Sequence, residues 1–294
     1  MRKFSNIKKN IPKVAKNFLV FLPAIISNIK IDIDIFLDLF IGFFIFSFIS
    51  FYVYFMNDFI EKDKDKFNKL KNNSSLSKNL NKKDILLLNI LLIIFIIILT
   101  QTIFFDVVLI GYIAIFYFYS FLKKIKYLDL ICLNSFYILR LIYGCNLINI
   151  DFSLLFIIFF VSVFLILSIF KRIIQINVNN LAEKNNIIAY DINDIKSLNL
   201  LSLLSFLISS VIFILFIFHN NYLDIEYLLS SSTNLNFNKI SYIIIYLIYT
   251  VNMGKFYFDV LTSKISTDMI EYLFKSKIVL ISCTIILSII ALNK

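Results

Sequence analysis

Oxygen-bearing side chains gather where a long apolar run ends, in the sequence YFMNDFIEKDKDK. A helix turns about 100° per residue, so a helix continuing two turns past Asn57 places Asp58, Glu61 and Asp65 within about 60° of one another. Carboxylates on one face repel each other unless a cation lies among them. Because Mg²⁺ prefers oxygen ligands, the spacing predicts a magnesium site on these four residues. The lysines that alternate with the acids leave open a second interpretation, a solvated charged stretch.

A phenol and an ammonium group occur together in the sequence YSFLKKIKYLD. Tyr119 and Lys123 are four residues apart, so they lie one above the other at the end of a helix. Together they are able to hold a phosphate group. The membrane interface also selects Tyr and Lys at helix ends, so the pair has a purely structural alternative.

Only three residues are arginines in this lysine-rich chain, and two of them occur in or beside apolar runs. Arg140 lies deep inside LDLICLNSFYILRLIYGCNL, where a charge costs about 2.5–3.5 kcal/mol on insertion scales. We expect it to face a polar cavity or an anionic partner, with a structural salt bridge as the alternative. Lys171 and Arg172 end another run, at LSIFKRIIQI, where cations suit both the helix dipole and an inner membrane surface. A metal on the acidic cluster and this basic pair would together clamp a diphosphate.

The elements that carry these residues are too apolar for a soluble protein. Of the 294 residues, 60% are hydrophobic, and the mean hydropathy is +0.87. About 20 helical residues cross the roughly 30 Å hydrocarbon layer, and apolar runs of this order recur along the whole chain. The sequence therefore predicts an all-α, polytopic membrane protein, a single domain over residues 1–294. Its expected transmembrane helices lie near 16–30, 35–56, 84–103, 105–122, 128–148, 152–170, 199–218, 240–256 and 276–292.

The positive charges behind the net charge of +10 are concentrated on one predicted face of the membrane. Most of the 29 Lys and Arg residues lie in the N-terminal segment and in the connections after the second, fourth, sixth and eighth predicted helices. By the positive-inside rule these segments are cytoplasmic, which puts the N-terminus inside and the C-terminus outside. The long inner loops would span 57–83 and 171–198. This asymmetry indicates membrane lipids as the partner of the basic charge and argues against nucleic acid.

The motifs resemble those of the UbiA-type intramembrane prenyltransferase superfamily. The superfamily's NDxxDxxxD motif matches Asn57, Asp58, Glu61 and Asp65, with Glu in place of one Asp, and its YxxxK pair matches Tyr119 and Lys123. Within it, PKVAKNFLVFLP, the stretch from Tyr119 through Arg140, and SIFKRIIQI resemble the branch of decaprenyl-phosphate phosphoribosyltransferases. This resemblance implies a bundle of about nine helices in a bacterial cytoplasmic membrane. Its central cavity would open to the cytoplasmic side.

The resemblance also implies an activity, the Mg²⁺-dependent transfer of 5-phosphoribose from phosphoribosyl diphosphate to a polyprenyl phosphate, with release of diphosphate, in cell-envelope biosynthesis. Roles would be divided among three groups of side chains. The metal ligands would be Asn57, Asp58, Glu61 and Asp65; Lys171, Arg172 and Tyr119 would stabilise the leaving charge; Lys16, Asn57, Lys123, Arg140 and Tyr190 would bind the substrates.

Two other functions remain open at this stage. A second enzyme class of the superfamily transfers a prenyl group from prenyl diphosphate to an aromatic acceptor, and it uses a second aspartate cluster. Asp191 and Asp194, directly after Tyr190, are the candidates for that cluster, although they are only three residues apart. The other alternative is a secondary transporter in which Arg140 and the acidic face bind a solute.

Overall fold

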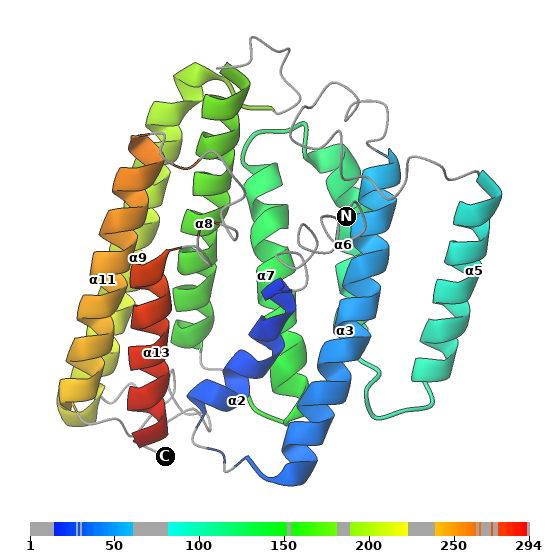
Figure 1. The fold of residues 1–294 in the computed structure, drawn as a ribbon, viewed down its shortest axis with the longest axis horizontal. Coiled ribbons are helices and arrows are strands. Elements are labelled where there is room, and N and C mark those ends of the chain that lie inside the picture. Colours follow the sequence, from blue (N-terminus) through cyan, green and yellow to red (C-terminus); the bar gives the residue numbers. More distant parts are fainter. Residues whose placement is uncertain are drawn as a thin grey trace. The chain divides into compact units, whose positions relative to one another are not determined.

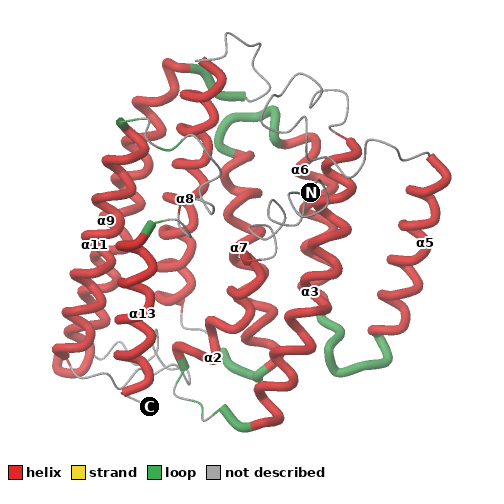
Figure 2. Tube along the Cα trace, viewed as in Figure 1, coloured by secondary structure: helices red, strands yellow, loops and turns green. Residues whose placement is uncertain are grey.

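Helices make up almost all of the structure. The structure is a computed structural model that describes residues 15–27, 29, 31–60, 82–151, 154–180, 189–222, 239–262, 265, 272 and 276–292. In this part of the chain helices account for 87% of the residues and no β-strand occurs (Figure 2). The elements are η1 (Lys16–Phe21), α2 (Leu22–Ile26), α3 (Ile33–Ile60), α5 (Lys82–Leu99), α6 (Val107–Leu122), α7 (Leu128–Leu147), α8 (Leu154–Asn180), η3 (Ile192–Asp194), α9 (Ile195–Tyr222), α11 (Lys239–Leu261) and α13 (Lys277–Leu292).

Several of these helices are long and apolar enough to cross a membrane. The segments that meet both criteria are Ile33–Asn57, Leu128–Leu147, Leu154–Asn177, Ile192–Leu215 and Ile243–Leu261. Shorter apolar helices lie at Lys16–Ile26, Ile85–Leu99, Val107–Leu122 and Lys277–Ile289. Each range predicted from the sequence therefore overlaps a helix, and the prediction of an all-α membrane protein is confirmed. The UbiA-like bundle and its cavity remain a prediction.

Two helices continue past their predicted ends. α3 reaches Ile60, so residues 57 and 58 belong to the helix, as the metal-site hypothesis requires. α8 reaches Asn180, so the prediction that a loop begins at residue 171 is wrong. The apolar face of α8 continues through Ile173 and Ile176, which are buried, and the charge of Arg172 is met by another side chain. A charged pair therefore did not mark the end of this helix.

The chain divides into two compact units, and α7 contributes to both. Unit 1 comprises Met1–Pro23, Ile31–Phe121 and Leu139–Asn149. Its helices are joined by aromatic side chains. The Phe46 ring packs edge-on against Tyr112 with ring centres 4.8 Å apart. The hydroxyl of Tyr52 in α3 donates to Asn89 in α5 at 2.6 Å and lies 2.8 Å from the hydroxyl of Tyr117 in α6.

Unit 2 comprises Ala24–Lys30, Leu122–Ile138 and Ile150–Lys294. Within it α8 and α9 lie side by side (Figure 1). Both helices bury serines, and small side chains allow neighbouring membrane helices to approach closely. Its hydrophobic core surrounds the last turns of α8, where Ile169, Phe170 and Ile173 pack with Leu198 and Phe256. This core encloses the helix segment that carries Lys171 and Arg172.

Candidate functional site

The polar face of α3 begins with two serines that bind the start of the chain. The side-chain amide of Asn17 in η1 donates to the hydroxyls of Ser47 and Ser50, at 3.1 Å each. Asn17 is fully buried, so these bonds replace the water that its amide loses. They fix η1 against α3.

The same face continues toward the predicted metal ligands. Positions 47, 50, 54 and 58 follow the three- and four-residue spacing of one helix face. Tyr54 lies close enough to Tyr112 of α6 to interact with it electrostatically. Asp58 is one turn further along, with Asn57 at its side. The side chain of Asp58, and all of Glu61 and Asp65, lie outside the described residues.

Arg140 reaches this face from α7. Its Nε donates to Asn17 Oδ1 at 2.9 Å, and its Nη2 donates to the Tyr112 hydroxyl at 2.8 Å. The guanidinium carbon lies 5.5 Å from the centre of the Phe46 ring and 5.1 Å from that of Tyr112, within cation–π range. Arg140 is only 1% exposed. We call Asn17, Ser47, Ser50, Tyr112 and Arg140 the Arg140 cluster.

A glycine permits this assembly. Arg140 and Gly144 lie one turn apart on α7, and a Cβ at Gly144 would stand 2.2 Å from the carbonyl oxygen of Val20. The backbone of η1 therefore touches α7 at a point where only glycine fits. This close approach brings Asn17 within reach of Arg140.

The predicted phosphate-binding residue Lys16 adjoins the Arg140 cluster. It precedes Asn17 in the chain and lies close enough to Tyr112 to interact with it electrostatically. Lys16 and Arg140, which are far apart in the sequence, thus both lie near Tyr112 in unit 1. Tyr119 is half-buried in α6, two residues beyond the Tyr117 hydroxyl that touches Tyr52 of α3.

In unit 2, Arg172 forms an ion pair that the sequence analysis missed. Its Nε and Nη2 donate to the two carboxylate oxygens of Asp129, and its Nη1 donates to Gln175. Asp129 is fully buried and Arg172 is 5% exposed. The sequence contained one usable signal, a carboxylate in the first turn of an apolar helix. The pairing itself joins residues 43 positions apart and leaves no local pattern.

Tyr190 is buried and has a backbone partner. The Tyr190 hydroxyl accepts a hydrogen bond from the backbone N–H of Tyr127 at 2.7 Å, and the Tyr190 residue is 2% exposed. Burial raises the pKa of Tyr190 to about 12, so the phenol is neutral at physiological pH. This contact gives Tyr190, which was predicted to bind substrate, a structural role.

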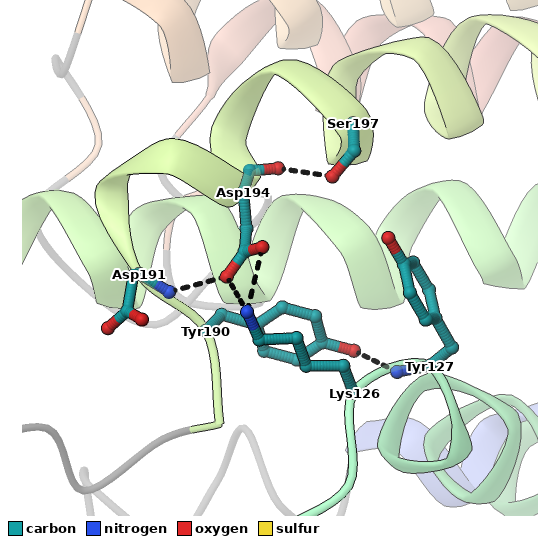
Figure 3. A network of polar contacts seen from close by, with 6 residues as sticks. All are labelled: Lys126, Tyr127, Tyr190, Asp191, Asp194 and Ser197. Atoms are coloured by element: carbon teal, nitrogen blue, oxygen red, sulfur yellow. Dashed lines mark hydrogen bonds and ion pairs between the residues drawn. The ribbon is translucent and has the colours of Figure 1, made fainter.

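Asp194 is engaged by a lysine and by the backbone. Lys126 Nζ lies 2.7 Å from one carboxylate oxygen of Asp194 and 2.9 Å from the other (Figure 3). The Asp191 N–H donates to Asp194 at 2.7 Å. The hydrogen bond with Asp194 raises the pKa of Lys126. Asp191 and Asp194 thus cap the start of the next helix.

The remaining predicted residues are placed individually. Lys123 is half-buried in the turn just after α6, and Lys171 is half-buried in α8. In the described ranges, no three or more His, Cys, Asp or Glu side chains come together. A scan against protein-family models and a search of the curated proteins return no match.

Proposed function

We propose that this protein transfers 5-phosphoribose from phosphoribosyl diphosphate to a polyprenyl phosphate in the membrane. One observation carries the proposal. The face of α3 that contributes Ser47 and Ser50 to the Arg140 cluster continues to Asn57 and residue 58. The proposed metal ligands at positions 57 and 58 therefore continue the face of α3 whose Ser47 and Ser50 belong to the Arg140 cluster.

The donor set suits a magnesium ion. Asn57 and Asp58 offer an amide and a carboxylate on adjacent helix positions, and Glu61 and Asp65 are proposed to complete the set. A bound Mg²⁺ would supply Lewis-acid stabilisation of the diphosphate leaving group. The chain's own residues would bind and orient the two substrates.

The cations and the phenol serve the charged groups of the reaction. As the bond from ribose C1 to the diphosphate breaks, negative charge grows on the diphosphate, and the sugar carbon becomes electron-poor. Within unit 1, Lys16 and Arg140 hold phosphate oxygens and Tyr119 donates a hydrogen bond to the leaving diphosphate. Of the cations in unit 2, Lys123 is proposed to bind a substrate phosphate and Lys171 to add positive charge. The lipid phosphate attacks C1 as an ionised oxygen, so the step requires no general base.

The pairing of Asp194 weighs against the prenyl-diphosphate alternative. That chemistry would recruit Asp191 and Asp194 to a second metal. Asp194 already accepts the Lys126 ammonium and a backbone N–H, and those contacts would have to break for a metal to bind.

The test is Asp58→Asn in the purified full-length protein in nanodiscs. Supplied with phosphoribosyl diphosphate and a polyprenyl phosphate, the wild type should form the lipid-linked phosphoribose and release diphosphate only when Mg²⁺ is present. The variant keeps the shape of the side chain but loses its charge, so turnover should fall roughly 100-fold or more.

The matched control is Asp34→Asn, in the first turn of the same helix. It should leave turnover unchanged. Undiminished Mg²⁺-dependent turnover in Asp58→Asn would defeat the metal site. Product formed from prenyl diphosphate and hydroxybenzoate instead would establish the aromatic-acceptor enzyme, and solute counterflow without chemical conversion would establish a transporter.

A further inference from the structure

The turn between α6 and α7 is held by residues that follow α8. Lys126 and Tyr127, in the turn, contact Asp194 and Tyr190, which lie more than 60 residues later in the chain (Figure 3). We call these four residues the loop clasp. All of them belong to unit 2.

The backbone at Tyr127 is strained. Its φ is 66°, in the left-handed region where a side chain with a Cβ is disfavoured. Non-glycine residues keep such a conformation only where surrounding contacts over-determine it, and they concentrate at functional sites. A glycine would adopt this φ without penalty, so the tyrosine needs external support.

Tyr190 supplies that support from a buried position. Its hydroxyl accepts the N–H of the strained residue itself, and the two rings meet edge to face at 6.4 Å. Tyr190 also belongs to the core around the end of α8 and is near enough to Asp129 and Arg172 to interact with both electrostatically. The strained turn is thereby tied to the segment that carries the Asp129–Arg172 pair.

Lys126 and Asp194 add a second tie at the surface. The lysine side chain is 41% exposed and that of Asp194 is 17% exposed. Asp194 in turn is held by the Asp191 N–H, and its backbone oxygen accepts the Ser197 hydroxyl (Figure 3). The clasp therefore combines a buried hydrogen bond with an exposed ion pair.

We propose that the loop clasp is a positioning device: Tyr190 and Asp194 hold the α6–α7 turn in its strained form and thereby fix the backbone of Lys123 for binding a substrate phosphate. Lys123 opens the turn whose other end is Tyr127. The inference rests on the proposed function for its ligand, while the strain and its support stand independently. Tyr190 and Asp194 act through Lys123 and do not touch substrate.

The central experiment compares Tyr190→Phe with the wild type, both full-length in nanodiscs. The variant keeps the ring and removes the acceptor. Amide hydrogen exchange over residues 123–130 should accelerate roughly fivefold, the size expected for one net hydrogen bond. The KM for phosphoribosyl diphosphate should rise by a similar factor while kcat stays within about twofold, because a positioned binding group acts on ground state and transition state alike.

A second background, Tyr127→Gly, tests whether Tyr190 supports the strained turn or only contributes to general packing. In a Tyr127→Gly background the turn keeps its conformation without support, so adding Tyr190→Phe should leave KM unchanged and should accelerate exchange only at the amide of residue 127, which loses its acceptor. Tyr249→Phe is the matched control, since it removes a buried hydroxyl that contacts Ser209 elsewhere in unit 2. It should leave the turn unchanged. An equal loss from Tyr190→Phe in both backgrounds, or no change in exchange, would overturn the clasp.

The two proposals fail differently. If the wild type shows no transfer, the proposed function falls, and the exchange measurement still decides whether Tyr190 supports the turn. If transfer occurs but Tyr190→Phe alters neither exchange nor KM, only the clasp falls. If Tyr190→Phe does not fold, Lys126→Asp and Asp194→Lys replace it. Each single variant should loosen the turn, and the double variant, in which the two charges are swapped, should restore it. A double variant in which amide hydrogen exchange and KM do not return to the wild-type values would count against the clasp.

Discussion

Arg140 in unit 1 and Arg172 in unit 2 are both buried in apolar helices, yet their surroundings differ in kind. Arg172 donates to both oxygens of a fully buried carboxylate, Asp129. Arg140 donates to an amide oxygen and a phenol oxygen and lies against two aromatic rings. The Arg172 guanidinium is thus paired with an opposite charge. The contacts just given for Arg140 are with polar oxygens and aromatic faces.

The difference separates two uses of a buried cation. A carboxylate cancels the positive charge of Arg172, so the pair is well suited to join α7 and α8 and poorly suited to attract a diphosphate. The amide and phenol oxygens and the two aromatic rings orient the Arg140 guanidinium. The comparison favours a structural role for Arg172, which had been expected to stabilise the leaving group. Arg140 remains the arginine that we propose to bind an anionic substrate.

The largest expected effect comes from breaking the ion pair on one side only. Asp129→Asn leaves Arg172 buried beside a neutral amide, and removing one partner of a buried pair typically costs about 3–5 kcal/mol. We expect a loss of stability of that order, measured by unfolding in detergent followed by circular dichroism.

The control for this prediction removes both charges. Asp129→Leu combined with Arg172→Met leaves no charge without its partner, so the double variant should recover most of the lost stability. A double variant as unstable as Asp129→Asn would mean that Arg172 has another essential partner. Unchanged stability of Asp129→Asn would contradict the structural role.

The sequence predicted the helices well because an apolar run of about 20 residues is itself the physical requirement for crossing a bilayer. It also predicted that Arg140 would need polar surroundings, from the cost of a buried charge. It did not reveal the partners. Asn17 lies 123 residues from Arg140, and contacts over such separations leave no local periodicity.

The error over Arg172 has a specific cause. A Lys-Arg pair after an apolar run is typical of a helix end at the membrane surface, and the prediction ended the helix there. The cost of burying a charge, which was considered for Arg140, also applies to Asp129 in the apolar LDLICLN stretch, and it would have predicted a buried cation as the partner of Asp129. It would not have chosen Arg172 over other cations, because that choice depends on how α7 packs against α8.

A second, smaller effect should come from Gly144→Ala, which acts on the Arg140 cluster alone. The new methyl group would stand 2.2 Å from the Val20 carbonyl oxygen, so η1 must move and Asn17 with it. Overpacking of this kind costs about 1–3 kcal/mol, partly offset by the helix propensity of alanine. The measurement is unfolding in detergent, together with the affinity for phosphoribosyl diphosphate, which should weaken.

Gly111→Ala is the matched control, because a Cβ there meets nothing within 4 Å. It should be neutral or stabilise the protein by up to about 1 kcal/mol. Equal behaviour of the two alanine variants would show that the contact between η1 and α7 does not hold the Arg140 cluster together.

The smallest effect on stability should come from Arg140→Lys, which retains the positive charge and changes its geometry. One ammonium cannot reproduce the fork that reaches Asn17 and Tyr112 in different directions, so about one hydrogen bond, roughly 1 kcal/mol, is lost. Affinity for phosphoribosyl diphosphate should nevertheless fall several-fold, because the positive charge is no longer held in a fixed orientation toward the substrate. Arg172→Lys should reverse the pattern, with a larger loss of stability and a smaller loss of affinity. Full affinity and turnover in Arg140→Lys would make both arginines structural and remove the distinction between the two units.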